Sequence, residues 1–454
     1  MTTTSAGAVH ALPDEALGNT SYLIELGSGL AASVDPRRDI DGHLELAERL
    51  GLRIVAGLET HLHADFVSGS RELAGRTGAD VYAARDAFLE YGQQGLAEGD
   101  ELRLGDVLVH AWGTPGHTPE HLSHLVIVDG TPAAVFSGGS LIRGGAARTD
   151  LVDSADTDRW SREQFRSVQR LSRLPGSTAL WPTHGAGSFC ATAPGQAPSG
   201  TIGDELAANP LLQVDDEETF VRALQAGFGS FPPYFLRLRD VNRHPALLHD
   251  LQPPQSLDPE AAHSLVAAGA WLVDARPIHA WARQHPHGSV SIELRPAFAS
   301  WLGWVIPFGA PTVLLVDDAD RAEAVRLARR IGYDRVLGWI AGGIDAWSAA
   351  DLPTQCADET DAPGARRRIA NGAMLVDVRQ TAELDSARIP DAVHFELGDI
   401  IAGRTPDANE AVLFCGHGER SATAASLLER RGIKTVNLVG GIGAWGAAGF
   451  PIRG

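Results

Sequence analysis

The stretch EAVLFCGHGERSATAASLLERRG, residues 410–432, decides the fold of the C-terminal part of the chain. Its start, EAVLF, predicts a buried strand, and SATAASLLERRG predicts an amphipathic helix that ends at Gly432. Cys415 lies between them, after the strand and before the helix N-terminus. Inward-pointing loop amides, the helix dipole and the nearby Arg420 all favour a thiolate. The sequence therefore predicts a nucleophilic cysteine rather than a buried structural one.

The order C-x-x-G-x-R-S in this loop resembles the active loop of rhodaneses, which carry a sulfane sulfur on the cysteine as a persulfide. The resemblance implies that Cys415 and Arg420 are catalytic. It also implies that the remaining loop residues bind substrate, namely Gly416, His417, Gly418, Glu419 and Ser421.

An internal repeat extends this pattern over the C-terminal part of the chain. Residues 271–292 match 374–395, and residues 312–347 match 411–445. Each unit reads as strands alternating with helices, which predicts a parallel sheet that is covered on both faces. An Asp-x-Arg pair recurs in both units and is interpreted as a structural tie between loops, as Asp274 with Arg276 and as Asp377 with Arg379.

Both units resemble rhodanese domains, over residues 256–354 and 362–454. In the first unit Val316 stands where Cys415 stands in the second, although Arg321 still aligns with Arg420. Valine has no nucleophile, so we expect the first unit to be catalytically silent and to serve in packing and interface formation.

The first 190 residues carry a group of histidines at the ends of apolar runs. THLHAD places His61, His63 and Asp65 at alternate positions, TPGHTPEH supplies His117, and WPTHGAGSF supplies His184. Residues of these types at strand–loop junctions predict a divalent metal site. The neighbouring histidines and the DPRRD stretch have simpler interpretations: His121 and His124 as turn residues, and residues 35–39 as a turn with solvated charges.

The three histidine segments, in this order, resemble the metallo-β-lactamase superfamily, an αββα sandwich with the metal at one edge. ETHLHADFVSG, TPGHTPEH and RTDL are most similar to its persulfide dioxygenase branch, and PTHGAGSF followed by TIGDELAANPLL resembles bacterial members fused to rhodanese domains. We therefore expect a multidomain α/β protein with this sandwich and its connector in residues 1–255.

Two departures from the superfamily pattern concern the metal ligands. Phe66 replaces the last histidine of H-x-H-x-D-H, which favours one metal ion over two. Gly139 replaces an aspartate that ligates Fe(II) in the dioxygenases. We therefore expect three histidines to hold one divalent ion, Fe(II) by family resemblance or Zn(II) as in three-His zinc enzymes. The expected ligands are His61, His63 and His117, with Asp65 and His184 as orienting residues or weak ligands.

Net charge, cysteine count and apolar runs indicate which partners and which cellular location to expect. The 454 residues carry a formal net charge of −19, which argues against nucleic acid as a partner. Three widely spaced cysteines, at 190, 356 and 415, do not make a disulfide framework and fit a reducing cytoplasm. The N-terminus lacks a signal-peptide pattern, and no run of about 18 apolar residues predicts a membrane span.

The resemblances imply that a low-molecular-weight thiol persulfide is oxidised by O₂ to sulfite at the metal, and that Cys415 transfers sulfane sulfur to or from sulfite or thiosulfate. A homodimer or tetramer is plausible for such a fusion. Two alternatives stay open. One is a zinc thioester hydrolase of the glyoxalase II type, and the other is a metal-free sulfur carrier in which only Cys415 reacts.

Overall fold

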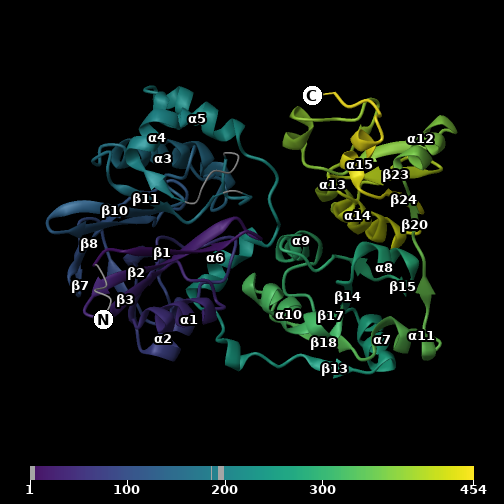
Figure 1. The fold of residues 1–454 in the computed structure, drawn as a ribbon, viewed down its shortest axis with the longest axis horizontal. Helices are drawn as coiled ribbons and strands as arrows, with labels where there is room; N and C mark the ends of the chain where they lie inside the picture. The colour runs from purple at the N-terminus through teal and green to yellow at the C-terminus, as the bar shows by residue number, and fades with distance from the viewer. Residues whose placement is uncertain (1–5, 186, 193–198, 454) are drawn as a thin grey trace. The chain divides into compact units, whose positions relative to one another are not determined.

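The computed structural model describes residues 6–185, 187–192 and 199–453 (Figure 1). It contains two compact units. One unit consists of Met1–Leu251 with Arg329–Gly332, and the other of Gln252–Ala328 with Tyr333–Gly454. The three-domain division into 1–255, 256–354 and 362–454 stays our proposal for the domain bounds.

Two six-stranded sheets form the first unit. The strands of the first sheet follow chain order: β1 (Val9–Asp14), β2 (Asn19–Gly27), β3 (Leu30–Val34), β4 (Arg53–Leu58), β5 (Asp80–Ala84) and β6 (Gln94–Leu96). The strands of the second sheet follow reversed chain order: β12 (Gly200–Thr201), β11 (Ala179–Pro182), β10 (Thr131–Gly138), β9 (Leu122–Val128), β8 (Val107–Gly113) and β7 (Glu101–Leu104). Strands joined by short turns, such as β8 and β9, pair antiparallel, whereas β3, β4 and β5 are parallel because helices connect them.

The two sheets share one hydrophobic core. Tyr22 and Ile24 of β2 belong to the same buried cluster as Val126 of β9 and Phe136 of β10. The rings of Tyr22 and Phe136 lie 5.3 Å apart, centroid to centroid. The face of each sheet that points away from this core must also be covered, because side chains alternate between the two faces of a strand and every residue of β2 is buried.

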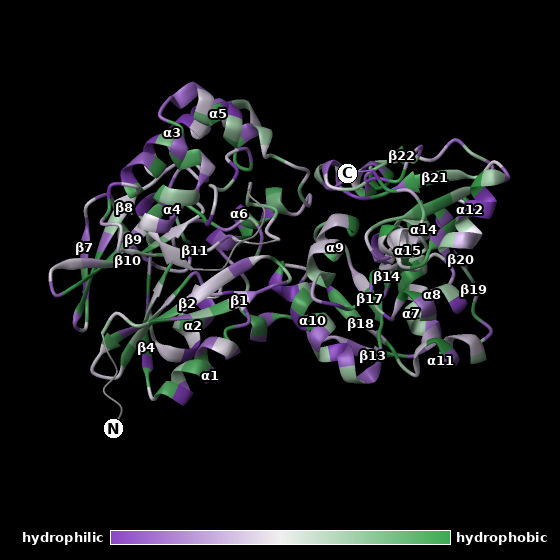
Figure 2. Ribbon diagram, turned by 45° about the horizontal axis from the view of Figure 1, so that its top comes forward, coloured by the Kyte–Doolittle hydropathy of each residue, from purple (hydrophilic) through white to green (hydrophobic). Residues whose placement is uncertain are grey.

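Helices cover these outer faces. Leu73 of α2 and Ala47 of α1 pack with Leu23 of the first sheet, while Val168 of α3 and Phe220 of α5 pack with the second. The helices of this unit are α1 (Asp41–Leu50), α2 (Ser70–Thr77), α3 (Thr157–Leu171), α4 (Ile202–Ala208), α5 (Glu217–Ala226) and α6 (Phe235–Arg243). Figure 2 shows hydrophilic and hydrophobic residues alternating along such helices, as one-sided burial requires. The layers are α, β, β, α, which confirms the predicted sandwich.

The second unit contains two five-stranded parallel sheets. The first has the order β13 (Gln255–Leu257), β18 (Val336–Ile340), β17 (Thr312–Leu315), β14 (Trp271–Asp274), β16 (Val290–Ser291). The second has the order β20 (Asp358–Thr360), β24 (Thr435–Leu438), β23 (Ala411–Phe414), β21 (Met374–Asp377), β22 (Val393–His394). Counted along the chain, both orders are first, fifth, fourth, second, third. The internal repeat is therefore a repeat of topology.

Each parallel sheet has its own helices. Those of the first repeat are α7 (Pro259–Ala267), α8 (Ile278–Arg283), α9 (Phe298–Val305), α10 (Arg321–Arg330) and α11 (Gly343–Ala349). Those of the second are α12 (Ala362–Ala370), α13 (Leu397–Ile401), α14 (Glu419–Glu429) and α15 (Gly441–Ala447). A two-stranded ribbon, β15 (His285–Pro286) with β19 (Thr354–Gln355), completes the unit.

Helix α14 of the second repeat is attached to strand β16 of the first. The backbone N–H of Ser291 donates to Ser426 Oγ at 3.1 Å, and Thr423 Oγ1 donates to the Ser291 carbonyl at 2.7 Å. Farther along the helix, Glu429 Oε1 lies 2.9 Å from His285 Nε2. These bonds hold the helix that carries the cysteine loop against the neighbouring repeat.

The Asp-x-Arg pairs tie loops together in both repeats. Arg379 donates to both oxygens of Asp377 and to the Ala387 carbonyl at 2.7 Å. Arg276 binds Asp274 and the Gln284 carbonyl in the same way. All four charged side chains are buried, so their role is structural.

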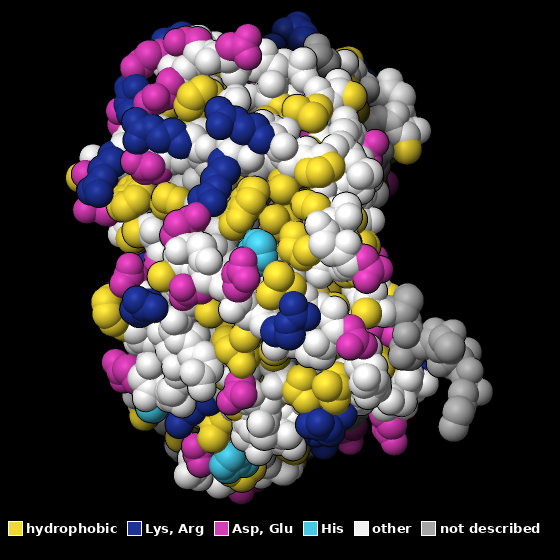
Figure 3. Space-filling view, turned by 90° about the vertical axis from the view of Figure 1, so that its left-hand side faces the viewer, with side chains coloured by type: hydrophobic (Ala, Val, Ile, Leu, Met, Phe, Trp, Pro, Cys, Tyr) yellow, Lys and Arg dark blue, Asp and Glu magenta, His cyan; other side chains and the backbone are white. Residues whose placement is uncertain are grey.

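The surface mixes charges of both signs. Figure 3 shows one face on which basic, acidic and apolar side chains are interspersed. Within the described part of the chain, no helix has the length and apolar character needed to cross a membrane.

Candidate active sites

The cysteine loop links β23 to α14. Cys415 follows the last residue of β23, is fully buried, and its Sγ accepts a hydrogen bond from the Gly418 N–H at 3.1 Å. Gly418 caps the helix with φ of 116°, a conformation that glycine adopts without strain. The Ser421 hydroxyl lies 3.6 Å from the same sulfur. The loop therefore turns a backbone amide and a helix N-terminus toward the thiol.

Arg420 lies on the first turn of α14, between Cys415 and an acidic partner. Its two Nη atoms donate to the two carboxylate oxygens of Glu383. Burial alone would lower the pKa of Arg420, but Glu383 and Cys415 outweigh burial and raise it, so the guanidinium keeps its charge. The guanidinium also lies over the ring of Trp301, 5.6 Å from its centroid. Sequence reasoning missed both Glu383 and Trp301, because they come from other segments of the chain.

The other predicted loop residues differ in exposure. Gly418 and Ser421 are buried, Gly416 and Glu419 are half-buried, and His417 is exposed. In the first repeat, Val316 follows β17 as Cys415 follows β23, and it is 4% exposed. The structure thus places an apolar side chain where the second repeat has its thiol.

The four metal-candidate histidines meet at one edge of the sandwich. His61 and His63 follow β4, His117 follows β8, and His184 follows β11. The ligand nitrogens of His61, His117 and His184 all lie within 4.8 Å of one another. Two further groups of the same kind contain His63: one with Asp35 and His61, and one with Asp65 and His184. The ligand set His61, His63 and His117 stays a prediction, and the group of His61, His117 and His184 is the all-histidine alternative that the structure brings together.

Hydrogen bonds orient the ring nitrogens of this trio. Thr60 gives its hydroxyl proton to Asp35 at 2.7 Å, so it accepts from His61 Nδ1 at 2.8 Å. The Arg148 carbonyl accepts from His117 Nδ1 at 2.6 Å. The Nε2 atoms of His61 and His117 are therefore left with lone pairs, as neutral ligand imidazoles require.

His184 has no hydrogen bond at Nδ1 among the described residues. Its Nδ1 faces the Asp65 carboxylate, 3.5 Å from Oδ2, and the negative charge of that carboxylate favours a proton on Nδ1. Its Nε2 then presents a lone pair to His61 Nε2, only 3.2 Å away. Two lone pairs at this distance repel unless a cation lies between them. Two metal–nitrogen bonds of about 2.0–2.1 Å at a tetrahedral angle separate the nitrogens by about 3.3 Å. The residues therefore fit one divalent ion.

Lowered pKa values support neutral imidazoles at His61 and His117. Burial, reinforced by the neighbouring histidines, holds the pKa of His61 well below its usual range. Burial and His184 lower the pKa of His117 to about 3, and the Nε2 of His117 has no hydrogen-bond partner among the described residues. A buried nitrogen of this kind needs a partner, and the described residues do not provide one.

His63 has one nitrogen in an acidic network, while its Nδ1 is buried without a hydrogen-bond partner among the described residues. Its Nε2 lies 3.1 Å from Glu59 Oε2 and 3.3 Å from Asp35 Oδ1. Burial would lower the pKa of His63, but the two carboxylates outweigh burial and raise it to about 10. Phe66, which occupies the second-metal histidine position, stacks on His63 at 4.2 Å.

Asp35 corrects an interpretation of the sequence. The DPRRD stretch was expected to be solvated, yet Asp35 is fully buried and Arg38 is 1% exposed. Asp35 accepts hydrogen bonds from the backbone and side chain of Thr60 and from the Thr183 hydroxyl. One feature of the sequence indicates that Asp35 lies near the histidines. Asp35 directly follows strand β3, which pairs with β4, the strand before His61 and His63.

His121 and His124 have backbone partners, and the interpretation of both as turn residues is wrong for His124, which lies within β9. His124 Nε2 lies 3.0 Å from the Glu59 carbonyl, and His121 Nε2 accepts from the Gly139 N–H at 3.0 Å. Asp65 accepts from the Asn19 amide at 3.3 Å and faces His184, and its role as an orienting residue or a weak ligand stays a prediction.

Gly139 faces the metal-candidate trio at close range. A Cβ atom added there would lie 2.3 Å from His117 Cδ2. The obstacle to a side chain is the His117 ring and not a positive φ, which occurs at the preceding Gly138. The ring of His117 thus occupies the space of the missing aspartate.

A Gly139→Asp variant should therefore lose stability and gain no metal. Forcing a side chain into the His117 ring is overpacking, which costs about 1–3 kcal/mol. The midpoint of thermal unfolding and the metal content of the purified protein measure the two effects. Gly139→Ala is the matched control, because it adds the clash without the carboxylate. Higher metal occupancy in Gly139→Asp than in both wild type and Gly139→Ala would contradict this expectation.

Comparison with known proteins agrees with this architecture. Residues 16–184 match the metallo-beta-lactamase superfamily, and residues 258–350 and 361–448 each match the rhodanese-like domain. A probable metallo-hydrolase of Burkholderia pseudomallei is 31% identical over 210 residues, covering 38% of this chain and 70% of that protein. The crystal structure of a metallo-beta-lactamase from Staphylococcus aureus matches with a TM-score of 0.67 and 27% identity, covering 74% of this chain and 99% of the other. The chain belongs to the metallo-beta-lactamase superfamily and carries two rhodanese-like domains.

Two further relatives are enzymes whose names state different reactions. A hydroxyacylglutathione hydrolase of Methylococcus capsulatus is 36% identical over 170 residues, covering 37% of this chain and 62% of that protein. The mitochondrial persulfide dioxygenase of Homo sapiens is 29% identical over 182 residues, covering 40% of this chain and 65% of that protein. The chain thus spans less than two thirds of the length of either relative.

Proposed function

We propose that this protein transfers sulfane sulfur at Cys415 and oxidises a low-molecular-weight thiol persulfide in its N-terminal domain. The Gly418 N–H directed at Cys415 Sγ at 3.1 Å, beside the charged Arg420, carries the proposal. The fusion of this rhodanese-like domain to a metallo-beta-lactamase domain, and the similarity to a persulfide dioxygenase, support the second activity.

The transfer step follows from the geometry of the loop. The Cys415 thiolate attacks the outer sulfur of thiosulfate, a new S–S bond forms, and sulfite leaves with the electron pair of the broken S–S bond. The loop amide and the helix N-terminus stabilise the resulting anionic persulfide, as does the fixed charge of Arg420. The reverse step gives thiosulfate from sulfite.

The oxidation would supply that sulfite. Overall, R–S–SH, O₂ and water give R–SH, sulfite and two protons, and the sulfane sulfur passes four electrons to O₂. A divalent ion held by His61, His117 and His184 would supply a Lewis acid for the sulfur and, as Fe(II), the redox chemistry. The Thr60 hydroxyl and the Arg148 carbonyl hold two of these rings in the ligand orientation.

Thioester hydrolysis at zinc is the second candidate. Three neutral imidazoles also suit a zinc ion that activates water, and a hydroxyacylglutathione hydrolase is among the relatives. Persulfide oxidation and thioester hydrolysis need different metals and different co-substrates, so an experiment can distinguish them.

Protein purified without oxygen and reconstituted separately with Fe(II) and Zn(II) tests these functions. We expect the iron form to consume one O₂ per persulfide and to release sulfite, because persulfide oxidation needs a redox metal. We expect the zinc form to consume none. An oxygen electrode, sulfite assay and thioester hydrolysis assay provide the measurements. Thioester hydrolysis without O₂ uptake would favour the hydrolase, and neither activity in either form would leave Cys415 as the only reactive group.

A further inference from the structure

The loop between β4 and α2, residues 59–69, carries His61, His63 and Asp65, and every residue of it is buried. Backbone N–H and C=O groups that are buried in a loop lack the partners that a helix or a sheet provides, so other groups must bind them. The side chains that bind this backbone therefore determine where the candidate metal ligands lie.

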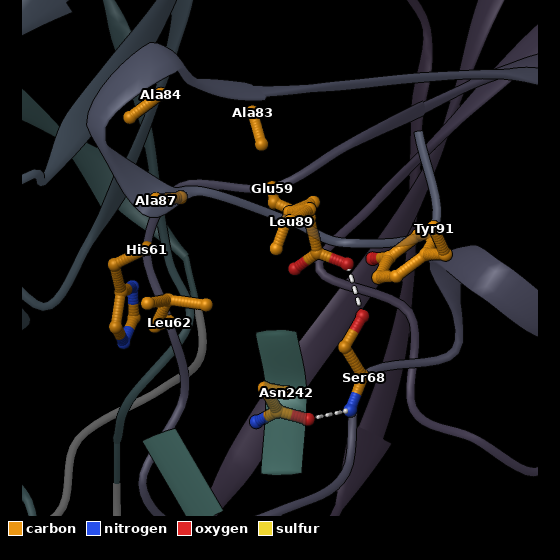
Figure 4. A pocket seen from close by; sticks show the side chains of 10 residues that line it. All are labelled: Glu59, His61, Leu62, Ser68, Ala83, Ala84, Ala87, Leu89, Tyr91 and Asn242. Atoms are coloured by element: carbon orange, nitrogen blue, oxygen red, sulfur yellow. Dashed lines mark hydrogen bonds between the residues drawn. The ribbon is translucent and has the colours of Figure 1, made fainter. Parts of the chain in front are cut away.

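Asn242 of helix α6 binds the loop at three points. Its Oδ1 accepts from the Ser68 N–H at 2.8 Å, as Figure 4 shows. Its Nδ2 donates to the carbonyls of His63 and Phe66 at 2.8 and 2.9 Å. The Asn242 side chain belongs to a residue that is 1% exposed, so water does not compete for these bonds. One buried amide thus fixes the backbone on both sides of Asp65.

Two further side chains of the same region bind the loop. Tyr234, the residue before α6, donates its hydroxyl to the Asp65 carbonyl at 2.8 Å. Arg239 donates to both carboxylate oxygens of Glu120, at 3.0 and 2.6 Å. Glu120 Oε1 also accepts from the Leu62 N–H at 3.0 Å. The loop is therefore tied to α6 directly and through Glu120.

The helix also connects two histidine loops. Arg239 and Asn242 lie on one face of α6, because they are three residues apart in the helix. Glu120 lies in the loop between β8 and β9, three residues after His117. One helix face thus binds the loop 59–69 and the loop that carries His117.

We propose that α6 forms part of the metal site, with Asn242, Tyr234 and Arg239 as positioning residues that hold the two histidine loops in place for one ion. The helix lies outside residues 16–184, the span that matches the metallo-beta-lactamase superfamily. This role deepens the persulfide oxidation proposed above and rests on it for the presence of an ion. It holds for either set of ligand histidines, because α6 binds both loops.

Asn242→Ala in the full chain removes the amide and its three hydrogen bonds. In metal-free protein we expect amide hydrogen exchange of residues 59–69, measured by mass spectrometry, to become at least about tenfold faster, because each bond contributes a factor of about 2–12. The affinity for Co(II) should fall about tenfold, the lower end for a residue that orients a ligand, because Asn242 acts through the backbone. The visible spectrum of bound Co(II), which depends on coordination geometry, should change as well.

Asn209→Ala is the matched control. Asn209 is also fully buried, and its amide donates to the Gly145 carbonyl at 3.1 Å and to Glu205 Oε2 at 2.9 Å, neither of which belongs to the histidine loops. Both variants lose a buried amide, so both should unfold at a lower temperature. Only Asn242→Ala should change the exchange of residues 59–69 and the Co(II) spectrum.

Tyr234→Phe is a milder variant that keeps the test available if Asn242→Ala does not fold. It removes the one hydrogen bond to the Asp65 carbonyl, so exchange of residues 59–69 should become about 2–12-fold faster. Unchanged exchange in either folded variant, or an equal loss of Co(II) affinity in Asn209→Ala, would overturn the role of α6. A wild type that binds no Co(II), together with faster exchange in Asn242→Ala, would instead refute the proposed metal chemistry and leave the positioning of the loop by α6 intact.

Discussion

Cys415→Ser should abolish sulfur transfer from thiosulfate to cyanide, with a loss of at least about 1,000-fold. The reason is chemical: a serine hydroxyl in the same loop is a far weaker nucleophile and carries no transferable sulfur. Thiocyanate formation measures the transfer. Mass spectrometry of thiosulfate-treated wild type should find one added sulfur atom, on the peptide that contains Cys415.

The exposed Cys356 provides the matched control for this substitution. Its sulfur donates to the Arg283 carbonyl at 3.0 Å, away from any helix N-terminus, so Cys356→Ser should keep full activity. Transfer that persists in Cys415→Ser, or a sulfur adduct on any peptide of the first repeat, would show that another group carries the sulfur. Val316 gives the first repeat no means to do so.

His117→Ala and His184→Ala should each weaken binding of a divalent ion by more than about 100-fold. Loss of a residue that only orients a ligand already costs about 10–100-fold, and loss of the ligand itself costs more. His63→Ala should cost less, because its Nε2 faces Glu59 and Asp35 rather than the trio. Titration with Co(II) or Zn(II), followed by metal analysis after gel filtration, gives the affinities.

His110→Ala is the control, since His110 lies on β8 and faces Glu101 at 3.3 Å, outside the trio. Unchanged metal affinity in His184→Ala, together with a large loss in His63→Ala, would restore the ligand set expected from the sequence. Equal metal binding in all four variants would show that these histidines hold no ion.

The fold could be predicted from local patterns in the sequence. The alternation of strands and helices predicts the parallel sheets, and the repeat of that alternation predicts the duplicated topology that β13–β18 and β20–β24 share. The position of Cys415 between a strand and a helix N-terminus could also be predicted, because these elements are contiguous in sequence.

The proposed metal trio could not be predicted from the sequence, because it depends on tertiary contacts. His61 and His63 look equivalent in sequence, and only the direction of each ring separates them: Thr60 turns one toward His184, while Glu59 and Asp35 hold the other. Asp35 and His184 follow other strands than His61 and His63 do, and 123 residues separate His184 from His61. Spacing in sequence does not encode such directions.

The hydrogen bonds between Ser291 and α14 join two segments that the ribosome makes at different times. Ser426 is synthesised 135 residues after Ser291, which amounts to roughly 10 s at the usual pace of a ribosome. The strand that receives α14 therefore emerges first and can fold before the helix exists. The repeat without a nucleophile is therefore available as a docking surface when α14 is made, and we expect its mutations to lower the yield of folded sulfur-transfer domain even where they change no residue near the thiol.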